Sequence, residues 1–262
     1  MIPIGDSVRS RTFPYVNIAI IAACVLAFLY QLTLSTAAPV VQGFAGFSEL
    51  DLFFFDWGAI PACLTDRLGR DPEVDPRALA FACPEGDQVL LTPISAMFIH
   101  GGWLHLIGNM IFLWVFGDNV EDAMGHARYA AFYVLVGVLA AATHIAVNQN
   151  DVIPAVGASG AIAGVLGAYL VLYPRATVSA ILPIFILFWI PFQVPAIFLI
   201  GFWFLMQLFN GVAGLAATDI VNAGGGVAWF AHIGGFVAGL VLVRVFVLGR
   251  RRPPRGLPPP RR

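Results

Sequence analysis

The chain has 262 residues, of which 59% are hydrophobic and 11% are charged, and its mean hydropathy is +0.84. Soluble domains carry about 25% charged residues, so the composition excludes an ordinary soluble domain and indicates a polytopic membrane protein. The formal net charge is −1, all 14 basic residues are Arg, and no nucleic-acid partner is expected. The length allows roughly six spans of about 20 residues and no separate soluble domain.

Apolar runs in chain order predict an all-α membrane protein, a six-transmembrane-helix bundle with a long first outer loop. The first run is too long for a signal peptide and lacks a small-residue cleavage pattern, so we interpret it as a span. The polar segment after it carries nine acidic residues and only three Arg before Thr92. The expected spans are residues 15–34, 97–117, 128–147, 157–173, 195–210 and 229–248.

The distribution of Arg predicts the topology. In a six-span arrangement most of the basic positions fall on one side, as the positive-inside rule requires, so both termini are expected to be cytoplasmic. The predicted parts are a cytoplasmic N-terminus (1–14), a membrane domain (15–249) and a disordered Arg/Pro-rich cytoplasmic tail (250–262). The positions that carry this argument are Arg9, Arg11, Arg128, Arg175 and the tail.

Residues 178–209 do not fit one span. They would measure roughly 48 Å as a helix, and Pro183, Pro191 and Pro195 interrupt them. A seventh span would place Arg175 or the tail outside. We therefore expect 178–190 to form a buried loop or an interfacial segment, and the conformation of 178–194 stays open.

Polar side chains occur at similar depths in three spans that all run from outside to inside. Counted back from the inner end of each helix with a rise of 1.5 Å per residue, His105 lies roughly 12 Å, Ser159 roughly 8 Å and His232 roughly 5 Å below the outer end of its span. Polar groups in hydrocarbon are costly, so a nucleophile with its general base is the first hypothesis. Taken singly, a Ser between glycines can serve helix packing, and a His can be a core residue or an ion-path ligand.

Glycines flank two of these positions. Gly160, Gly164 and Gly167 form an i, i+4, i+7 stripe beside Ser159, and Gly235 and Gly239 share a helix face with His232. Such stripes let helix backbones approach closely, so that a short Ser side chain can reach an imidazole on the neighbouring helix. Helix packing alone explains the glycines but not the His among them.

His105 and Asn109 are i, i+4 neighbours and offer two hydrogen-bond donors on one helix face. Stabilising a developing oxyanion requires such donors. Zinc binding is the competing interpretation, but His100 and His105 are five residues apart and the HExxH arrangement is absent. No metal is expected.

With these residues in place, the chain resembles a rhomboid-family intramembrane serine protease of the bacterial type, over about residues 10–249. Two further stretches, beginning at Asp56 and at Tyr173, resemble segments common in bacterial members. The motifs that carry the resemblance are His100, His105 and Asn109, then Gly157-Ala158-Ser159-Gly160, then Ala231-His232 with Gly235 and Gly239, together with Asp56-Trp57-Gly58-Ala59-Ile60-Pro61 and Tyr173-Pro174-Arg175-Ala176.

The resemblance implies a Ser-His dyad without an acidic third member and without a cofactor. Ser159 would attack the scissile carbonyl and His232 would act as the base, while the Ser159 backbone N–H, His105 and Asn109 would hold the oxyanion. His100 would order the neighbouring polar network, and Gly157 would support the site. The substrates would be transmembrane segments of other proteins, cut near their outer ends. The expected location is the bacterial inner membrane, with the active site open to the outer face.

Two departures from the family limit this transfer. The position four residues after the nucleophile, aromatic in some members, is Ala163, so what orients His232 is left open; a Trp-Arg pair of the first loop is also missing. Glu121 matches an acidic position of the family. It either ties a helix end to a neighbouring helix or is a solvated charge.

Two other functions are compatible with the sequence: an inactive rhomboid-like protein with a binding or chaperone-like role, and a small transporter. The substrate and oligomeric state are not indicated.

Three cysteines complete the sequence analysis. Cys24 lies in the first span, whereas Cys63 and Cys83 fall in the loop expected outside, where disulfides persist. A disulfide and two free thiols are both compatible with the sequence, because it does not show whether the two Cα atoms come within about 7 Å.

Overall fold

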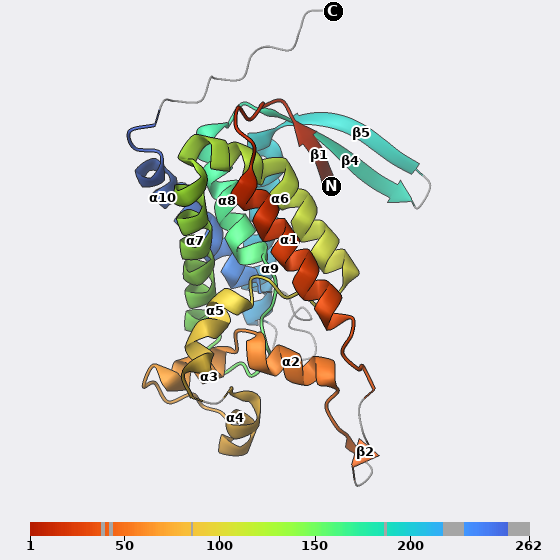
Figure 1. Ribbon diagram of the computed structural model, residues 1–262, viewed down its shortest axis with the longest axis vertical. Coiled ribbons are helices and arrows are strands. Elements are labelled where there is room, and N and C mark those ends of the chain that lie inside the picture. Colours follow the sequence, from red (N-terminus) through yellow and green to blue (C-terminus); the bar gives the residue numbers. More distant parts are fainter. Residues whose placement is uncertain (38–39, 42–43, 85, 186–187, 217–227, 251–262) are drawn as a thin grey trace, which may run out of the picture.

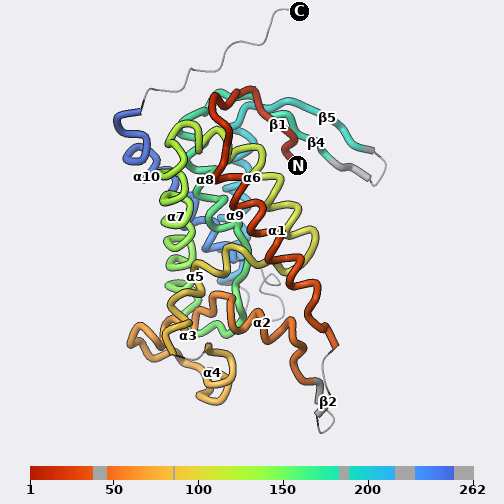
Figure 2. Tube along the Cα trace, viewed as in Figure 1, coloured from red at the N-terminus to blue at the C-terminus, as the bar shows by residue number. Residues whose placement is uncertain are grey.

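The computed structural model describes residues 1–37, 40–41, 44–84, 86–185, 188–216 and 228–250, and it is mostly helical (Figure 1). Figure 2 traces the same path of the chain. Among these described residues, three helices (α7, α9 and α10) could cross a membrane by length and composition, and two shorter helices, α1 and α8, are also apolar. The prediction of a mostly helical membrane protein is confirmed, whereas the six-span arrangement stays a prediction. The six longer helices are α1 (Tyr15–Gln31), α6 (Trp103–Met124), α7 (His126–Val147), α8 (Ser159–Leu172), α9 (Ala196–Ala216) and α10 (Trp229–Phe246).

Helix α8 lies at the centre of the helical part. Every residue from Ala161 to Tyr169 is buried, because α6, α7 and α10 pack around it. A helix that is apolar on all sides is expected in such a central position. Its first residue, Ser159, therefore lies where several helix ends meet.

Helix α6 begins later and ends later than the predicted span 97–117. Gly101 and Gly102 precede its first turn, and it continues through three acidic residues to Met124. Two of these acids are satisfied by the N-terminal segment: Ser10 donates to Asp118, and Arg11 Nε donates to Asp122 at 2.9 Å. Because these charges have partners, the helix can continue past the end of the apolar run.

Glu121, the third acid, binds the start of α1. Its two carboxylate oxygens accept hydrogen bonds from the backbone N–H groups of Val16 (3.0 Å) and Asn17 (2.7 Å), and the side chain is fully buried. The first N–H groups of a helix have no partner within it, and a negative charge is favoured at that end. Of the two interpretations of Glu121, the one that ties a helix end to its neighbour is confirmed.

An antiparallel sheet lies at the end of the molecule where α1 begins (Figure 1). Its order is β1 (Ile2–Asp6), β4 (Thr177–Phe185) and β5 (Phe188–Pro195). Pro183 of the central strand lies beyond the part paired with β1, which runs from Ile181 to Val178, so its missing N–H breaks no bond to β1. The predicted loop 178–190 is thus a paired hairpin, and all-α is too narrow a description; its interfacial position stays a prediction.

Asp6 anchors this sheet to the helices. It accepts a hydrogen bond from Asn119 Nδ2 of α6 at 3.1 Å and another from the Tyr169 hydroxyl of α8. Because burial disfavours the charged form, the pKa of Asp6 is raised to about 6. The N-terminal residues, predicted only as a cytoplasmic segment, are therefore part of the folded structure, whereas the predicted tail beyond Arg250 lies outside the described residues.

The segment between α1 and α6 forms short helices at the opposite end of the molecule (Figure 1). They are α2 (Glu49–Trp57), α3 (Pro61–Arg67), α4 (Pro76–Ala82), the 3-10 helix η1 (Gly86–Leu91) and α5 (Thr92–Ser95), and a two-residue pair, β2 (Val40–Val41) and β3 (Phe44–Ala45), precedes them. Ile60, Cys63, Leu64 and Val89 form a small core of their own there. This core holds the segment as a folded cap.

A disulfide joins Cys63 of α3 to Cys83 after α4, with their Cα atoms 5.3 Å apart. This settles the alternative that the sequence left open. Closing a loop of about 20 residues is worth on the order of 3 kcal/mol in the chain-entropy model, so Cys63→Ser/Cys83→Ser should lose stability of that order. Mass spectrometry of unreduced, alkylated protein checks the bond: alkylation of both residues would contradict it and weaken the placement of this segment on an oxidising side.

The glycine stripes bring α8 and α10 together. A Cβ added to Gly235 would fall on the carbonyl oxygen of Gly160, and one added to Gly239 would fall on that of Gly164. A Cβ on Gly167 would likewise meet the backbone of Phe236. The predicted close approach is present, and it leaves no space for a side chain at these positions.

Gly235→Val and Gly239→Val are expected to lower both thermal stability and activity, because the added side chain must push α10 away from α8. Overpacking typically costs about 1–3 kcal/mol, and a collision with backbone is harder to relieve than one with a side chain. Gly201→Val in α9 is the matched control, since a Cβ there meets nothing within 4 Å. Wild-type melting temperature and activity in both α10 variants would refute the close-packing argument.

Candidate active site

Ser159 and His232 form a hydrogen-bonded pair between α8 and α10. Ser159 is the first residue of α8, and His232 lies in the first turn of α10. The Ser159 Oγ lies 2.7 Å from His232 Nε2, and His232 is 8% exposed. A hydroxyl that donates to an unprotonated imidazole nitrogen is the arrangement of a nucleophile with its general base. The structure thus brings together two residues that the sequence separates by 73 positions.

The chain before Ser159 is fixed by the segment between α1 and α6. Ala155 and Ala59 exchange two backbone hydrogen bonds, of 2.9 and 3.0 Å, and the N–H of Gly157 donates to Ala96 at 2.8 Å. Gly157 has φ +121°, a conformation that L side chains rarely adopt. These bonds set the direction in which the chain enters α8, and they therefore position Ser159.

The side chains of His105 and Asn109 face Gly157 from α6. A Cβ added to Gly157 would lie 2.6 Å from His105 Nε2 and 3.6 Å from Asn109 Nδ2. The Gly101 N–H donates to His105 Nδ1 at 3.4 Å, so in the neutral ring the proton is on Nε2, the atom that faces Gly157. Two donors predicted from sequence thus converge beside Gly157, two positions before Ser159.

The side-chain amide of Asn109 is a buried hydrogen-bond donor that is unpaired within the described residues. Its Nδ2 has no hydrogen-bond partner among the described residues, and the residue is 8% exposed. Buried polar groups are nearly always paired, so an unpaired one calls for an explanation. A donor used only when substrate charge develops is one such explanation.

His100 packs against His105 and is held by α1 through its backbone. Its ring meets that of His105 edge-on with centroids 5.2 Å apart, and its backbone exchanges hydrogen bonds with the Gln31 amide of α1. Neither ring nitrogen has a partner in the described part of the chain, so its predicted ordering of a polar network stays a prediction. In the same residues no group of three His, Cys, Asp or Glu side chains could hold a metal.

Two residues of α9 contact His232 and were not predicted. The Nδ1 of His232 lies 2.7 Å from Gln207 Oε1, and the Trp203 ring lies 5.8 Å from the imidazole, centroid to centroid. Trp229 of α10 approaches it edge-on at 6.2 Å. The sequence left open what orients His232, because position 163 is Ala; in the structure the side chains that contact the imidazole include two from α9. A polar Gln within the apolar run 178–209 was the available signal, because polar residues in spans have a reason.

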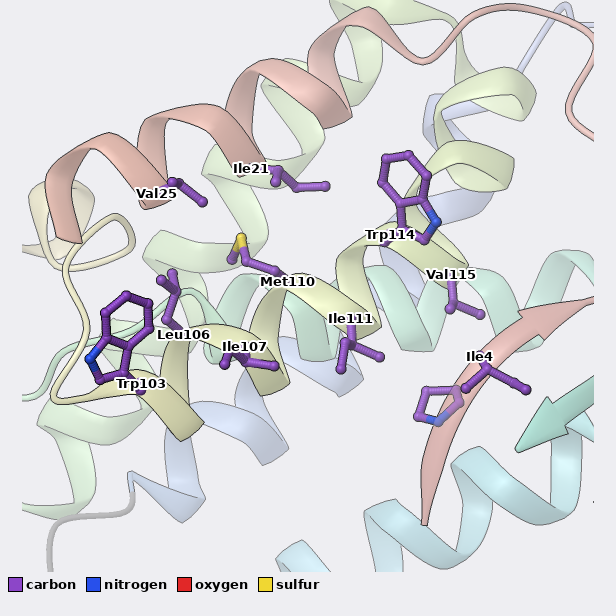
Figure 3. A pocket seen from close by; sticks show the side chains of 11 residues that line it. Ile4, Ile21, Val25, Trp103, Leu106, Ile107, Met110, Ile111, Trp114 and Val115 are labelled. Atoms are coloured by element: carbon purple, nitrogen blue, oxygen red, sulfur yellow. The ribbon is translucent and has the colours of Figure 1, made fainter. Parts of the chain in front are cut away.

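Two hollows lie in different places. A small one of about 50 Å³ adjoins Ser159, Gly160 and His144. A larger groove of about 560 Å³ runs between α1 and α6, with Trp103 toward one end and Ile4 of β1 near the other (Figure 3). The larger groove is lined by apolar residues and contains neither Ser159 nor His232, so it is separate from this pair of residues.

Comparison with known proteins places these residues in context. The Rhomboid domain family matches residues 88–249, which include Ser159, His232, His105 and Asn109. RHOMBOID-like protein 5 of Arabidopsis thaliana is 40% identical over 77 residues, 29% of this chain and 25% of the relative. RHOMBOID-like protein 6, mitochondrial, of the same plant is 29% identical over 149 residues, 57% and 41% of the two chains. Rhomboid protein 1, mitochondrial, of Saccharomyces cerevisiae is 30% identical over 157 residues, 56% and 39%. The chain thus spans less than half the length of these relatives.

Proposed function

The chain belongs to the rhomboid family, and on this premise we propose that it is an intramembrane serine endopeptidase that uses Ser159 and His232 as a catalytic dyad. The observation that carries the proposal is the 2.7 Å contact between Ser159 Oγ and His232 Nε2, which is partly buried. Ser159 attacks the scissile carbonyl while His232 takes its proton. The imidazolium then passes this proton to the leaving amine. In the second half of the reaction His232 takes a proton from the water that attacks the acyl-enzyme, and it returns the proton to Ser159 Oγ as the ester bond breaks.

Three donors stabilise the tetrahedral intermediate in this proposal. They are the Ser159 backbone N–H, His105 Nε2–H and Asn109 Nδ2–H. The first N–H groups of a helix lack partners within it, which leaves the N–H of Ser159 available at the start of α8. Because Gly157 has no side chain, the oxygen of the scissile carbonyl can approach His105 and Asn109 past Gly157.

The substrates, in this proposal, are transmembrane segments of other proteins, cut near their outer ends. Supporting it, Ser159 begins α8 at the end of the molecule that carries the segment between α1 and α6 with its disulfide, away from the sheet (Figure 1). The proposal includes six spans within residues 15–249, cytoplasmic termini and a site open to the outer face. The bilayer is that of a bacterial inner membrane.

Labelling with a fluorophosphonate tests the proposal without a known substrate. We expect intact-mass analysis of the full chain to show one adduct, located at Ser159 by peptide mapping and absent from Ser159→Ala. Absence of an adduct, under conditions that label an active relative, would favour the inactive, binding or chaperone-like function instead.

A further inference from the structure

We propose that Gln207 of α9 is a positioning residue for the base: it holds His232 in the one tautomer that can accept the proton of Ser159. The inference rests on the proposed function for its role in catalysis, but the hydrogen bonds that carry it are independent of that function. Gln207 lies between Trp203 and His232 and is 7% exposed. It thus takes the place that an acid holds in a Ser-His-Asp triad.

The orientation of the Gln207 amide follows from its two neighbours. Its Nε2 lies 3.3 Å from the Trp203 backbone carbonyl, one helical turn earlier, and a carbonyl oxygen can only accept. The amide nitrogen must therefore face Trp203. Consequently the acceptor, Oε1, faces His232 Nδ1 at 2.7 Å.

The tautomer of His232 follows in turn. Since Oε1 accepts only, Nδ1 must carry a proton to donate to it. In the neutral ring Nε2 then has a free lone pair, and Nε2 is the atom 2.7 Å from Ser159 Oγ. The chain of bonds from Trp203 through Gln207 and His232 to Ser159 thus directs the hydroxyl proton toward the base.

Helix α9 is suited to this task by its spacing. Trp203 and Gln207 are i, i+4 neighbours, so both lie on one face of α9 toward α10. Trp203 contacts the imidazole ring while Gln207 binds its nitrogen. A neutral amide gives orientation without the cost of placing a second charge inside a membrane protein.

Gln207→Leu tests the proposal, because Leu has a similar size and no acceptor. We expect fluorophosphonate labelling of Ser159 to slow by about 10–10²-fold, below the roughly 10⁴-fold loss when a triad acid is neutralised. Gln207→Glu keeps an acceptor at the same reach and should restore the rate to within about 10-fold of wild type. Phe209→Leu, a 68% exposed position of α9, is the matched control and should label at the wild-type rate. Wild-type labelling of Gln207→Leu, or no rescue by Glu, would overturn the proposal.

Nitrogen-15 NMR of histidine-labelled full-length protein reads the tautomer directly and needs no activity. The chain has five His, and the signal of His232 is identified by its loss in His232→Ala. We expect the Nδ1–H tautomer in wild type and a mixture of tautomers in Gln207→Leu. An Nε2–H tautomer in wild type would refute the proposal even if the protein labels well, whereas the expected spectrum with no labelling would refute only the proposed function.

Discussion

Ser159→Ala and His232→Ala are each expected to reduce cleavage of a transmembrane substrate to the background rate, and the double variant is expected to be little worse. The reason is that, in the proposed mechanism, Ser159 Oγ and His232 Nε2 act as one unit across a 2.7 Å contact. In a soluble serine protease, removing either member costs about 2 × 10⁶ in kcat, nearly as much as removing all members. The measurement is the cleavage rate of purified full-length protein reconstituted in vesicles with a model transmembrane peptide.

The two single variants differ in what they do to the fold. Ser159→Ala removes one hydroxyl and should melt near the wild-type temperature, whereas His232→Ala also leaves Gln207 Oε1 without its donor and should be somewhat less stable. Ser35→Ala, in the exposed segment after α1, serves as the control and should cut normally. Cleavage by Ser159→Ala at the wild-type rate would show that another group is the nucleophile.

The contact between Ser159 and His232 could be predicted because its signals are local. Ser159, His232 and His105 are polar groups at similar depth in apolar runs, and the glycines beside two of them indicate which helices approach. Each of these features can be counted along one helix with a rise of 1.5 Å per residue. The structure then confirms the predicted contact between α8 and α10.

The sheet could not be predicted in the same way. A nearly continuous apolar run with three prolines is compatible with a strand, a loop or a broken helix, because periodicity does not distinguish buried strands from buried helices. The partner of β4 is Ile2–Asp6, more than 170 residues earlier in the chain, and nothing local in either segment specifies this pairing. Gln207 was missed for a related reason: its role depends on which residue of α10 faces it.

Asn109→Ala is expected to lower kcat by about 10²–10³-fold with little change in KM, the usual cost of removing one oxyanion donor. The structure separates this role from a structural one. Since Asn109 Nδ2 has no partner among the described residues, its removal breaks no hydrogen bond there, and the melting temperature should stay near that of wild type. Asn109→Asp keeps the size but puts an acceptor toward the oxyanion, so it should lose more activity than the Ala variant. An effect confined to KM would indicate a substrate contact instead.

Gly157→Ala tests the same proposed oxyanion site through the residue that faces His105 and Asn109. The backbone at φ +121° disfavours any side chain, and the new Cβ would lie 2.6 Å from His105 Nε2, so it would displace one donor and fill the approach of the oxygen. We expect a loss of kcat at least as large as that of Asn109→Ala, accompanied by reduced stability. Gly108→Ala in α6, where a Cβ meets nothing within 4 Å, is the matched control and should be nearly silent. If Gly157→Ala retained wild-type kcat, the oxyanion would have to bind elsewhere than beside His105 and Asn109.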